Sequence, residues 1–353
     1  MMERLDPLLS TPPAFAAAAA REILRDGFGL DTSLTPLAGE RDQNFRADMA
    51  DGRRFLLKIS NPADGRDVVS MQTAALAHIE QADPDLPVMR TLPATTGEPW
   101  IEVTGPDGRA CPVRLFTFLP GRRAKAEELT LPGLRSYGQV SARLGRALRG
   151  FFHPAADYEI RWDLTHALKL RPLIRYLPGA KQPQVARILD RFEARVVPVL
   201  PRLRAQVIHA DLSLDNALLN EDLQVSGIVD FGDMTHAPLV FDLAVTIADV
   251  LADRVDGADV AEAMIAGYIS VTPLEEEEAE LLADLVAARL AMAVTIIAWR
   301  SGLYPGHSGY SGTNERAFLD AIDVVDPGAL TRRFRDAARG LPYRSAASRD
   351  LLA

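Results

Sequence analysis

The feature that most constrains the fold of this 353-residue chain is a pair of polar loops, each preceded by a short apolar run. The first loop, His209-Ala-Asp-Leu-Ser-Leu-Asp-Asn216, has the spacing H-x-D-x-x-x-x-N, and the second is Asp230-Phe-Gly-Asp233. Short apolar runs predict buried strands, so each loop places carboxylates at the end of a strand. For one loop alone, carboxylates that cap strands in a solvated crevice would be an adequate explanation. Two such loops in this order favour a catalytic site.

These loops hold the groups that phosphoryl transfer needs. A carboxylate must orient the acceptor hydroxyl and accept its proton, and oxygen ligands must hold magnesium against the donor phosphates. We therefore predict that Asp211 is the catalytic carboxylate and that Asn216 and Asp230 are the magnesium ligands. Because Asp211 already fits the hydroxyl-orienting position, we expect the ring of His209 to anchor the loop rather than to act as a base.

Both loops resemble those of the aminoglycoside phosphotransferase family, whose members share the protein-kinase-like fold. The segments Asp42-Gln-Asn-Phe45, Val225-Ser-Gly-Ile-Val-Asp-Phe-Gly-Asp-Met234 and Val240-Phe-Asp-Leu-Ala244 resemble the hydroxylysine kinase branch. They are also similar to the kinase-like segment that some bacteria fuse to class III aminotransferases. The resemblance runs in order over residues 34–251. It implies the cofactor Mg²⁺ and ATP or GTP as the phosphate donor.

The resemblance further implies an α+β, bilobal fold, with a small antiparallel-sheet N-terminal lobe over residues 1–118 and a mostly helical C-terminal lobe over 119–353. The apolar pattern agrees with this division. In the first lobe we expect strands at 34–37, 44–49, 54–59 and 110–118, with Asp51-Gly52 as a hairpin turn, and helices at 13–28 and 67–82. In the second we expect helices at 131–148, 162–176, 184–203, 238–251 and, after a capping box that starts at Thr272, through 299.

The N-terminal lobe holds the nucleotide-binding candidates. Lys58 is the one charge in an apolar strand, and the resemblance assigns it to the α and β phosphates of the donor. The helix position that matches its usual glutamate partner is Gln72, which supplies no countercharge. Asn44 could cover the phosphates, although its glycine-poor segment could also be a simple polar turn. The segment Phe116-Thr117-Phe118-Leu119 resembles the hinge that binds a purine through its backbone, although its side chains could be plain core.

The remaining candidates support the catalytic loop or contact the acceptor. The resemblance assigns Asp242 a structural role, in which it braces the loop. An amine on the acceptor would pair with Asp233 or with a carboxylate from the C-terminal helices, and a carboxylate on the acceptor would pair with Arg161 or Arg300. Trp162 could stack on the acceptor, although an aromatic residue on a long helix is more often part of the core.

Composition excludes several other classes of protein. With 48% hydrophobic and 25% charged residues the chain is expected to be globular, and its net charge of −9 opposes binding to nucleic acid or to an anionic membrane. Cys111 is the only cysteine, so no intrachain disulfide forms and a cytoplasmic location is expected. The apolar stretch 281–299 contains Asp284 and Arg289, which argues against a membrane span. The expected partners are a nucleotide and a small-molecule substrate.

The leading hypothesis is a kinase that transfers the γ-phosphate of ATP or GTP to a hydroxyl of a small amine-bearing metabolite, such as a hydroxylysine-like or aminoglycoside-like compound. The alternative is a catalytically weak or silent nucleotide- or metabolite-binding module with a regulatory role, which Gln72 and the glycine-poor loop favour. A protein substrate is less favoured, since no A-P-E-like segment follows Asp230-Phe-Gly. The sequence leaves open the acceptor, the donor base, the oligomeric state and whether the chain is part of a longer fusion.

Overall fold

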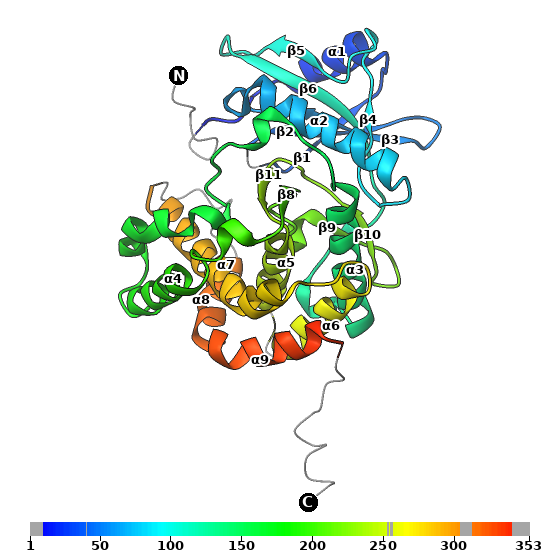
Figure 1. Ribbon diagram of the computed structural model, residues 1–353. Helices are drawn as coiled ribbons and strands as arrows, with labels where there is room; N and C mark the ends of the chain where they lie inside the picture. Colours follow the sequence, from blue (N-terminus) through cyan, green and yellow to red (C-terminus); the bar gives the residue numbers. More distant parts are fainter. Residues whose placement is uncertain (1–9, 40, 253, 255–256, 304–312, 341–353) are drawn as a thin grey trace, which may run out of the picture. The chain divides into compact units, whose positions relative to one another are not determined.

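The computed structural model describes residues 10–39, 41–252, 254, 257–303 and 313–340 (Figure 1). The contacts within the chain divide it into two compact units. The N-terminal unit comprises residues 1–120 together with 153–156, and the C-terminal unit comprises 121–152 together with 157–353.

The N-terminal unit is built on one antiparallel sheet, as expected. Its strands are β1 (Leu34–Leu37), β2 (Gln43–Asp48), β3 (Arg54–Ile59), β4 (Thr91–Leu92), β5 (Ile101–Thr104) and β6 (Ala110–Thr117). The strand order is β1-β2-β3-β6-β4, and β5 also pairs with β6. The helices of this unit are α1 (Ala17–Phe28) and α2 (Gly65–Ala82), with short 3-10 helices η2 (Pro62–Asp64) and η4 (Pro154–Ala156).

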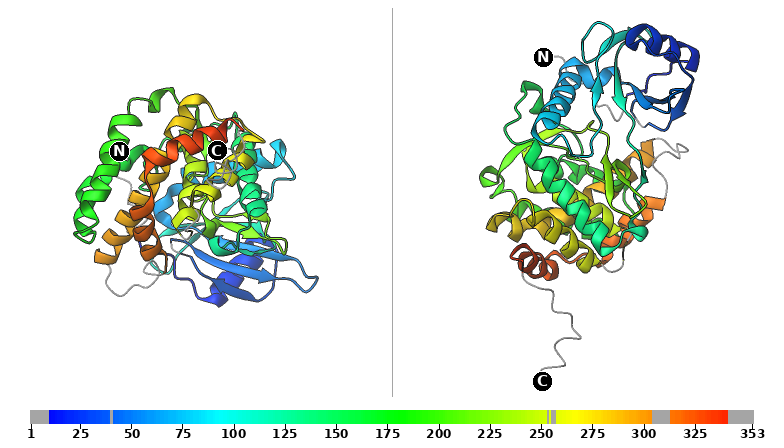
Figure 2. Two further views of the ribbon diagram at one scale, coloured as in Figure 1. Left: turned by 90° about the horizontal axis from the view of Figure 1, so that it is seen from below. Right: turned by 90° about the vertical axis from the view of Figure 1, so that its right-hand side faces the viewer.

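Local sequence explains how this sheet forms. The expected turn at Asp51-Gly52 joins β2 to β3, and Gly52 has a φ of +86°, a value that glycine adopts without strain. Helix α1 buries Ala20, Leu24 and Phe28, which are spaced four residues apart and therefore share one face. That face belongs to the same apolar core as β2, β3 and β6, and Figure 2 shows α1 in dark blue against these strands.

The C-terminal unit is mostly helical, also as expected. Its α-helices are α3 (Leu131–Ala147), α4 (Gln182–Arg195), α5 (Val240–Ala252), α6 (Gly257–Ile269), α7 (Glu276–Leu303), α8 (Thr313–Val324) and α9 (Pro327–Ala338). Its 3-10 helices are η3 (Ala126–Glu128), η5 (Leu164–Tyr176), η6 (Leu200–Arg202) and η7 (Leu214–Asn216). Two small antiparallel sheets complete it: β8 (Ala205–Ile208) with β11 (Thr235–Pro238), and β10 (Val225–Ile228) with β9 (Ala217–Leu219) and β7 (Arg122–Arg123).

In the N-terminal unit, α1 begins at Ala17, four residues later than expected. In the C-terminal unit, three expected helices differ from those observed, and proline explains two of the differences. The segment expected as a helix at 162–176 forms η5, a 3-10 helix with Pro172 inside it. The helix expected at 184–203 ends at Arg195, because Pro198 lacks the N–H that would continue it. The long helix begins at Glu276 rather than at the capping box of Thr272, and Glu278 instead accepts a hydrogen bond from the N–H of Glu275 at 2.9 Å.

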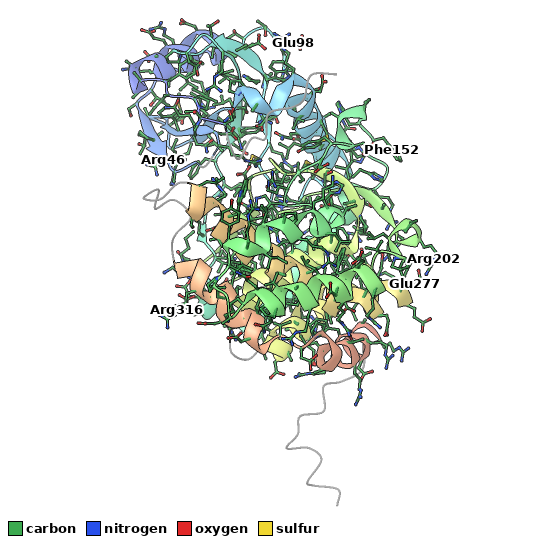
Figure 3. All side chains as sticks on the ribbon, turned by 90° about the vertical axis from the view of Figure 1, so that its left-hand side faces the viewer. Arg46, Glu98, Phe152, Arg202, Glu277 and Arg316 are labelled. Carbon is green, nitrogen blue, oxygen red and sulfur yellow. The ribbon has the colours of Figure 1, made fainter. Side chains whose placement is uncertain are left out.

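Helix α7 is the central helix of the C-terminal unit. It packs against α4, α5, α8, α9 and η5. By length and composition it could cross a membrane, but its most apolar 18-residue window is entirely buried inside the protein, which is typical of a core helix. At its N-terminal end Glu277 accepts hydrogen bonds from Arg202, and Figure 3 shows this pair at the surface.

Helices α3 and α6 cross so closely that two positions admit only glycine. A Cβ atom at Gly138 of α3 would lie 2.0 Å from the carbonyl oxygen of Met264. A Cβ atom at Gly267 of α6 would lie 2.0 Å from the carbonyl oxygen of Arg135. Because each neighbour is a backbone atom, no change of rotamer would relieve the overlap.

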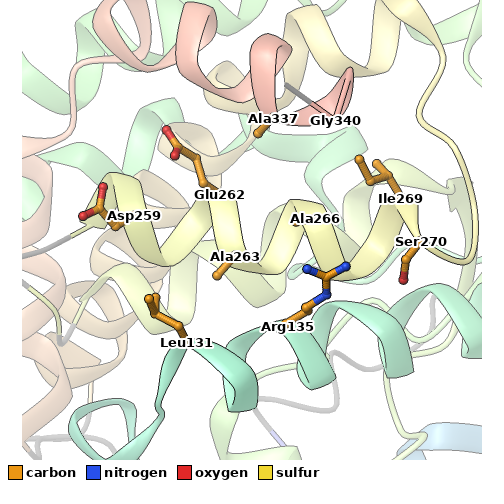
Figure 4. Close-up of a pocket in the computed structure, with 10 residues that line it drawn as sticks. All are labelled: Leu131, Arg135, Asp259, Glu262, Ala263, Ala266, Ile269, Ser270, Ala337 and Gly340. Atoms are coloured by element: carbon orange, nitrogen blue, oxygen red, sulfur yellow. The ribbon is translucent and has the colours of Figure 1, made fainter. Parts of the chain in front are cut away.

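A cavity of about 720 Å³ lies between α3, α6 and α9 beside this crossing (Figure 4). Its lining is largely apolar, and the Asp259 and Glu262 carboxylates at its edge form ion pairs with Arg333 of α9. None of its lining residues belongs to the two loops that the sequence singles out.

We predict that Gly138→Ala destabilises the protein. Overpacking against a backbone atom costs up to about 3 kcal/mol, and replacing glycine within a helix recovers about 1 kcal/mol, so the free energy of unfolding should fall by about 2 kcal/mol. Urea denaturation measures this change. Gly179→Ala is the control, since a Cβ atom there meets no atom within 4 Å. Equal unfolding free energies for Gly138→Ala and wild type would contradict the close approach of α3 and α6.

Candidate active site

The backbone of the catalytic loop is fixed at its start by α5. The loop leaves β8 at Ile208 and turns sharply at Ala210, whose φ of +66° lies in the left-handed region. Asp242 of α5 accepts hydrogen bonds from the N–H of His209 at 3.1 Å and from that of Ala210 at 2.8 Å. Burial raises the pKa of Asp242. Both oxygen atoms of this buried carboxylate therefore hold the loop in its strained turn.

Further along the loop, a second carboxylate of α5 holds the backbone. Asp249 accepts a hydrogen bond from the N–H of Leu214 at 2.7 Å. It follows Asp242 by seven residues, so both lie on one face of the helix. The hydroxyl of Tyr137 from α3 lies 2.9 Å from the carbonyl oxygen of Leu212 and also contacts the next carbonyl. Nothing in the sequence analysis pointed to Asp249 or Tyr137, although the seven-residue spacing on an apolar helix was visible.

The structure brings Asp211 and Asn216 together at the two ends of the loop. The amide nitrogen of Asn216 donates to the Oδ2 atom of Asp211 at 2.8 Å and to its carbonyl oxygen at 2.9 Å. This leaves the amide oxygen of Asn216 as its acceptor atom for a cation. The other carboxylate oxygen of Asp211, Oδ1, accepts a hydrogen bond from Arg289 at 2.8 Å.

The loop at Asp230 is attached to the catalytic loop by two contacts. The N–H of Val229 donates to the carbonyl oxygen of Asn216 at 2.9 Å, and the ring of His209 lies 3.2 Å from the carbonyl oxygen of Val229. The His209 ring also packs on Phe231, with 4.8 Å between centroids. Burial lowers the pKa of His209, so its ring is largely neutral at pH 7. These contacts give it the position of an anchor between the loops.

Asp230 itself is exposed and takes a φ of +58°, in the left-handed region. Its carboxylate and the amide oxygen of Asn216 are hard oxygen donors, the type that magnesium prefers. Over the described residues, no group of three or more His, Cys, Asp or Glu side chains is arranged to hold a metal. A magnesium ion here would therefore need donor phosphates or water to complete its ligands.

The candidate acceptor residues have roles inside the C-terminal unit. The ring of Trp162 lies against the guanidinium of Arg289, 4.7 Å from its centroid, so one face of this ring is not open to a substrate. The guanidinium of Arg161 lies 4.5 Å from the ring centroid of Trp299. Asp233 is buried, and Arg300 is half-buried on α7.

In the N-terminal unit, Lys58 has a countercharge that the sequence analysis did not expect. Its ammonium lies 2.7 Å from the carboxylate of Asp42, and both side chains are about nine-tenths buried. The other oxygen of Asp42 accepts the N–H of Asn61 at 2.8 Å. The countercharge of Lys58 is therefore supplied by the loop before β2 and not by the α2 position at which Gln72 stands.

Gln72, the α2 residue expected opposite Lys58, accepts a hydrogen bond from Arg114 at 2.8 Å. Arg114 lies directly opposite Lys58 in the register of β6 and β3, and it also donates to Ser60 at 2.9 Å. Gln72 thus holds a buried cation beside Lys58. Burial raises the pKa of the nearby Asp64 to about 7, and the Asp42 carboxylate adds to the rise.

The other nucleotide-binding candidates lie on the same sheet. Asn44 of β2 is the register partner of Lys58, and its buried amide oxygen has no hydrogen-bond partner among the described residues. Phe116 is buried in β6. Within the segment 116–119 that resembles a purine-binding hinge, the N–H of Phe118 donates to the carbonyl oxygen of Arg54 at 3.2 Å. The N–H of Leu119, for which the described part of the chain provides no hydrogen bond, is the better candidate.

Comparison with known proteins decides the family. Residues 33–282, more than half of the chain, match the model of the phosphotransferase enzyme family. The chain belongs to this family. The resemblance drawn from the two loops is thereby confirmed, and the loops are the ones at which this phosphotransferase carries its candidate catalytic and metal-binding groups.

Two kinds of curated amino-acid kinase are similar to this phosphotransferase. Hydroxylysine kinase of Mus musculus is 29% identical over 325 residues, covering 85% of this chain and 86% of that protein. Hydroxylysine kinase of Bos taurus is 30% identical over 324 residues, with coverage of 85% and 86%. Homoserine kinase of Azorhizobium caulinodans is 32% identical over 204 residues, covering 54% of this chain and 59% of that protein.

Solved structures support the fold. The amicoumacin kinase hAmiN, in complex with AMP-PNP, Ca²⁺ and Ami, has a TM-score of 0.66 at 14% identity and covers 96% of this chain and 97% of its own. The microcompartment-associated aminopropanol kinase has a TM-score of 0.65 at 21% identity, with coverage of 93% and 99%. The kinase-like α+β fold expected from the sequence is thus confirmed.

We predict that Asp249→Asn changes how stability depends on pH. The folded pKa of Asp249, about 7, lies above its value of about 4 in the unfolded chain, so folding favours the protonated form. The wild type should therefore lose stability as pH rises from about 4 through 7, and the neutral asparagine should not. The difference in unfolding free energy, variant minus wild type, should increase between pH 5 and pH 8 in urea titrations. A difference that stays constant or decreases would contradict the pKa shift of Asp249.

Proposed function

We propose that this phosphotransferase transfers the γ-phosphate of ATP to a hydroxyl of a small amine-bearing metabolite, and that the acceptor is a hydroxylated amino acid. The proposal rests on one observation. Hydrogen bonds link Asp211 to Asn216 and link Asn216 to the loop of Asp230, beside the paired strands β9 and β10. The names of the similar proteins support the acceptor class, because hydroxylysine and homoserine are both hydroxylated amino acids.

Asp211 would act on the acceptor. Its carboxylate accepts the proton of the acceptor hydroxyl while the hydroxyl oxygen forms a bond to the γ-phosphorus. The bond from that phosphorus to the β,γ-bridging oxygen breaks, and the bridging oxygen leaves with ADP. The hydrogen bond from Asn216 fixes one carboxylate oxygen of Asp211 during this step.

Asn216 and Asp230 would hold magnesium through the amide oxygen and the carboxylate. Bound magnesium neutralises charge on the donor phosphates. Lys58 would contact the α and β phosphates, and Asp42 would keep its ammonium oriented when no nucleotide is bound. Asn44 and Leu119 are our candidates for further nucleotide contacts. ATP is the preferred donor because the amicoumacin kinase was solved with the ATP analogue AMP-PNP.

A silent binding module is less well supported than a working kinase. Gln72, which supplies no countercharge to Lys58, was one of the two reasons to consider a silent module, and the carboxylate of Asp42 supplies that charge instead. For location we propose a reducing cytoplasm, since the one cysteine, Cys111, is buried as a free thiol.

The proposal predicts a specific preference among acceptors. We expect magnesium-dependent consumption of ATP with a hydroxylated amino acid, and a kcat/KM at least about tenfold lower for its N-acetylated form, because acetylation removes the positive charge that a carboxylate would bind. The measurement is a coupled assay of ADP release over hydroxylated amino acids, amino alcohols and aminoglycosides. Unchanged kcat/KM after acetylation, or better turnover of neutral sugars, would contradict the acceptor class.

A further inference from the structure

Arg289 is a buried cation in contact with the candidate catalytic carboxylate. It lies on α7, and only 8% of its side chain is exposed. Its Nη2 atom donates to the Oδ1 atom of Asp211 at 2.8 Å. In the sequence this residue stands out only as a charge that interrupts an apolar stretch, and nothing in the function derived so far uses it.

The orientation of Arg289 is fixed by contacts that do not involve Asp211. Its Nη1 atom donates to the carbonyl oxygen of Trp162 at 3.0 Å, and its guanidinium lies against the ring of the same residue. The guanidinium of Arg161, the residue before Trp162, lies over the ring of Trp299, which follows Arg289 by ten residues on α7. Two neighbouring guanidinium–indole contacts thus fasten this segment to α7, and the planar guanidinium has little freedom to turn.

Asp211 is consequently held from two sides. Asn216 donates to Oδ2 and Arg289 donates to Oδ1, so both carboxylate oxygens have a fixed partner. Each carboxylate oxygen can accept two hydrogen bonds, so a single bond to Asn216 or to Arg289 does not exhaust the acceptor capacity of its atom. Rotation of the carboxylate about its Cβ–Cγ bond would break both bonds.

We propose that Arg289 is a positioning residue for phosphoryl transfer, which holds the Asp211 carboxylate at the angle that the acceptor hydroxyl requires. This inference rests on the proposed function. Arg289 would act through Asp211 and not through the nucleotide or the acceptor. Its removal should therefore slow the transfer step and leave substrate binding nearly unchanged, because errors of about 1 Å in the position of a catalytic group can cost about 100-fold in rate.

The test is a double-mutant cycle of Arg289→Gln and Asp211→Asn, assayed with ATP and the best acceptor of the wild type. We expect Arg289→Gln to lower kcat by about 10- to 100-fold, with KM for ATP and for the acceptor within about threefold of wild type. In the Asp211→Asn background the same substitution should change kcat by less than about threefold, since the group that it positions is already lost. Arg289→Lys should recover part of the rate, because it keeps the charge without the fork of donors.

Arg195→Gln is the matched control. Arg195 of α4 donates to Asp284 of α7, the helix that carries Arg289, at 3.0 Å. Its loss therefore also breaks an ion pair to α7, but at a site without contact to Asp211. We expect its kcat to stay within about twofold of wild type.

Two results would overturn the inference. One is an unchanged kcat with a raised KM for the acceptor, which would make Arg289 a binding residue. The other is an equal loss of kcat in the wild-type and Asp211→Asn backgrounds. If Arg289→Gln does not fold, the same double-mutant cycle is measured with Arg289→Lys in place of Arg289→Gln, and the same two results would overturn the inference. A wild type that is inactive with every acceptor would refute the proposed function and the inference together, whereas an active wild type with equal losses refutes the inference alone.

Discussion

Two carboxylates on one face of α5 hold the backbone of the catalytic loop, and the other features of the candidate site depend on them. Asp242 and Asp249 accept hydrogen bonds from N–H groups at the start and in the middle of the loop. The loop needs this support because Ala210 adopts a left-handed φ, which costs free energy in a residue other than glycine. Buried N–H groups without these acceptors would cost about 1–3 kcal/mol each. Helix α5 therefore stabilises the strained conformation of the catalytic loop.

The second loop takes its position from the first. The N–H of Val229 and the ring of His209 connect the strand before Asp230 to the catalytic loop. Asp230 itself has a left-handed φ, which turns the chain at the point where its carboxylate is exposed. Magnesium and phosphates would add favourable interactions to a geometry that the protein already maintains. This agrees with a reaction in which positioning and charge neutralisation supply most of the rate enhancement.

The sequence was sufficient for the features that depend on short spacings. The two loops, the hairpin at Asp51-Gly52 and the division into a sheet unit and a helical unit follow from local patterns, and the structure contains each of them. The pairing of Lys58 with Asp42 could not be predicted, because it depends on which loop the sheet register brings beside β3. Arg289 could not be predicted for a similar reason. Its contact with Asp211 joins residues 78 positions apart, and an arginine in an apolar helix is uninformative until its neighbours are known.

The central claim, that Asp230 binds the metal–nucleotide complex while Asp211 acts on the acceptor, is tested most directly by isothermal titration of ATP in the presence of Mg²⁺. We predict that Asp230→Ala weakens binding at least about tenfold, whereas Asp211→Asn binds within about threefold of wild type. Asp222→Ala, at an exposed aspartate in the turn between β9 and β10, should bind like the wild type. An affinity for Asp230→Ala equal to that of the wild type, or an equal loss for Asp211→Asn, would contradict the account.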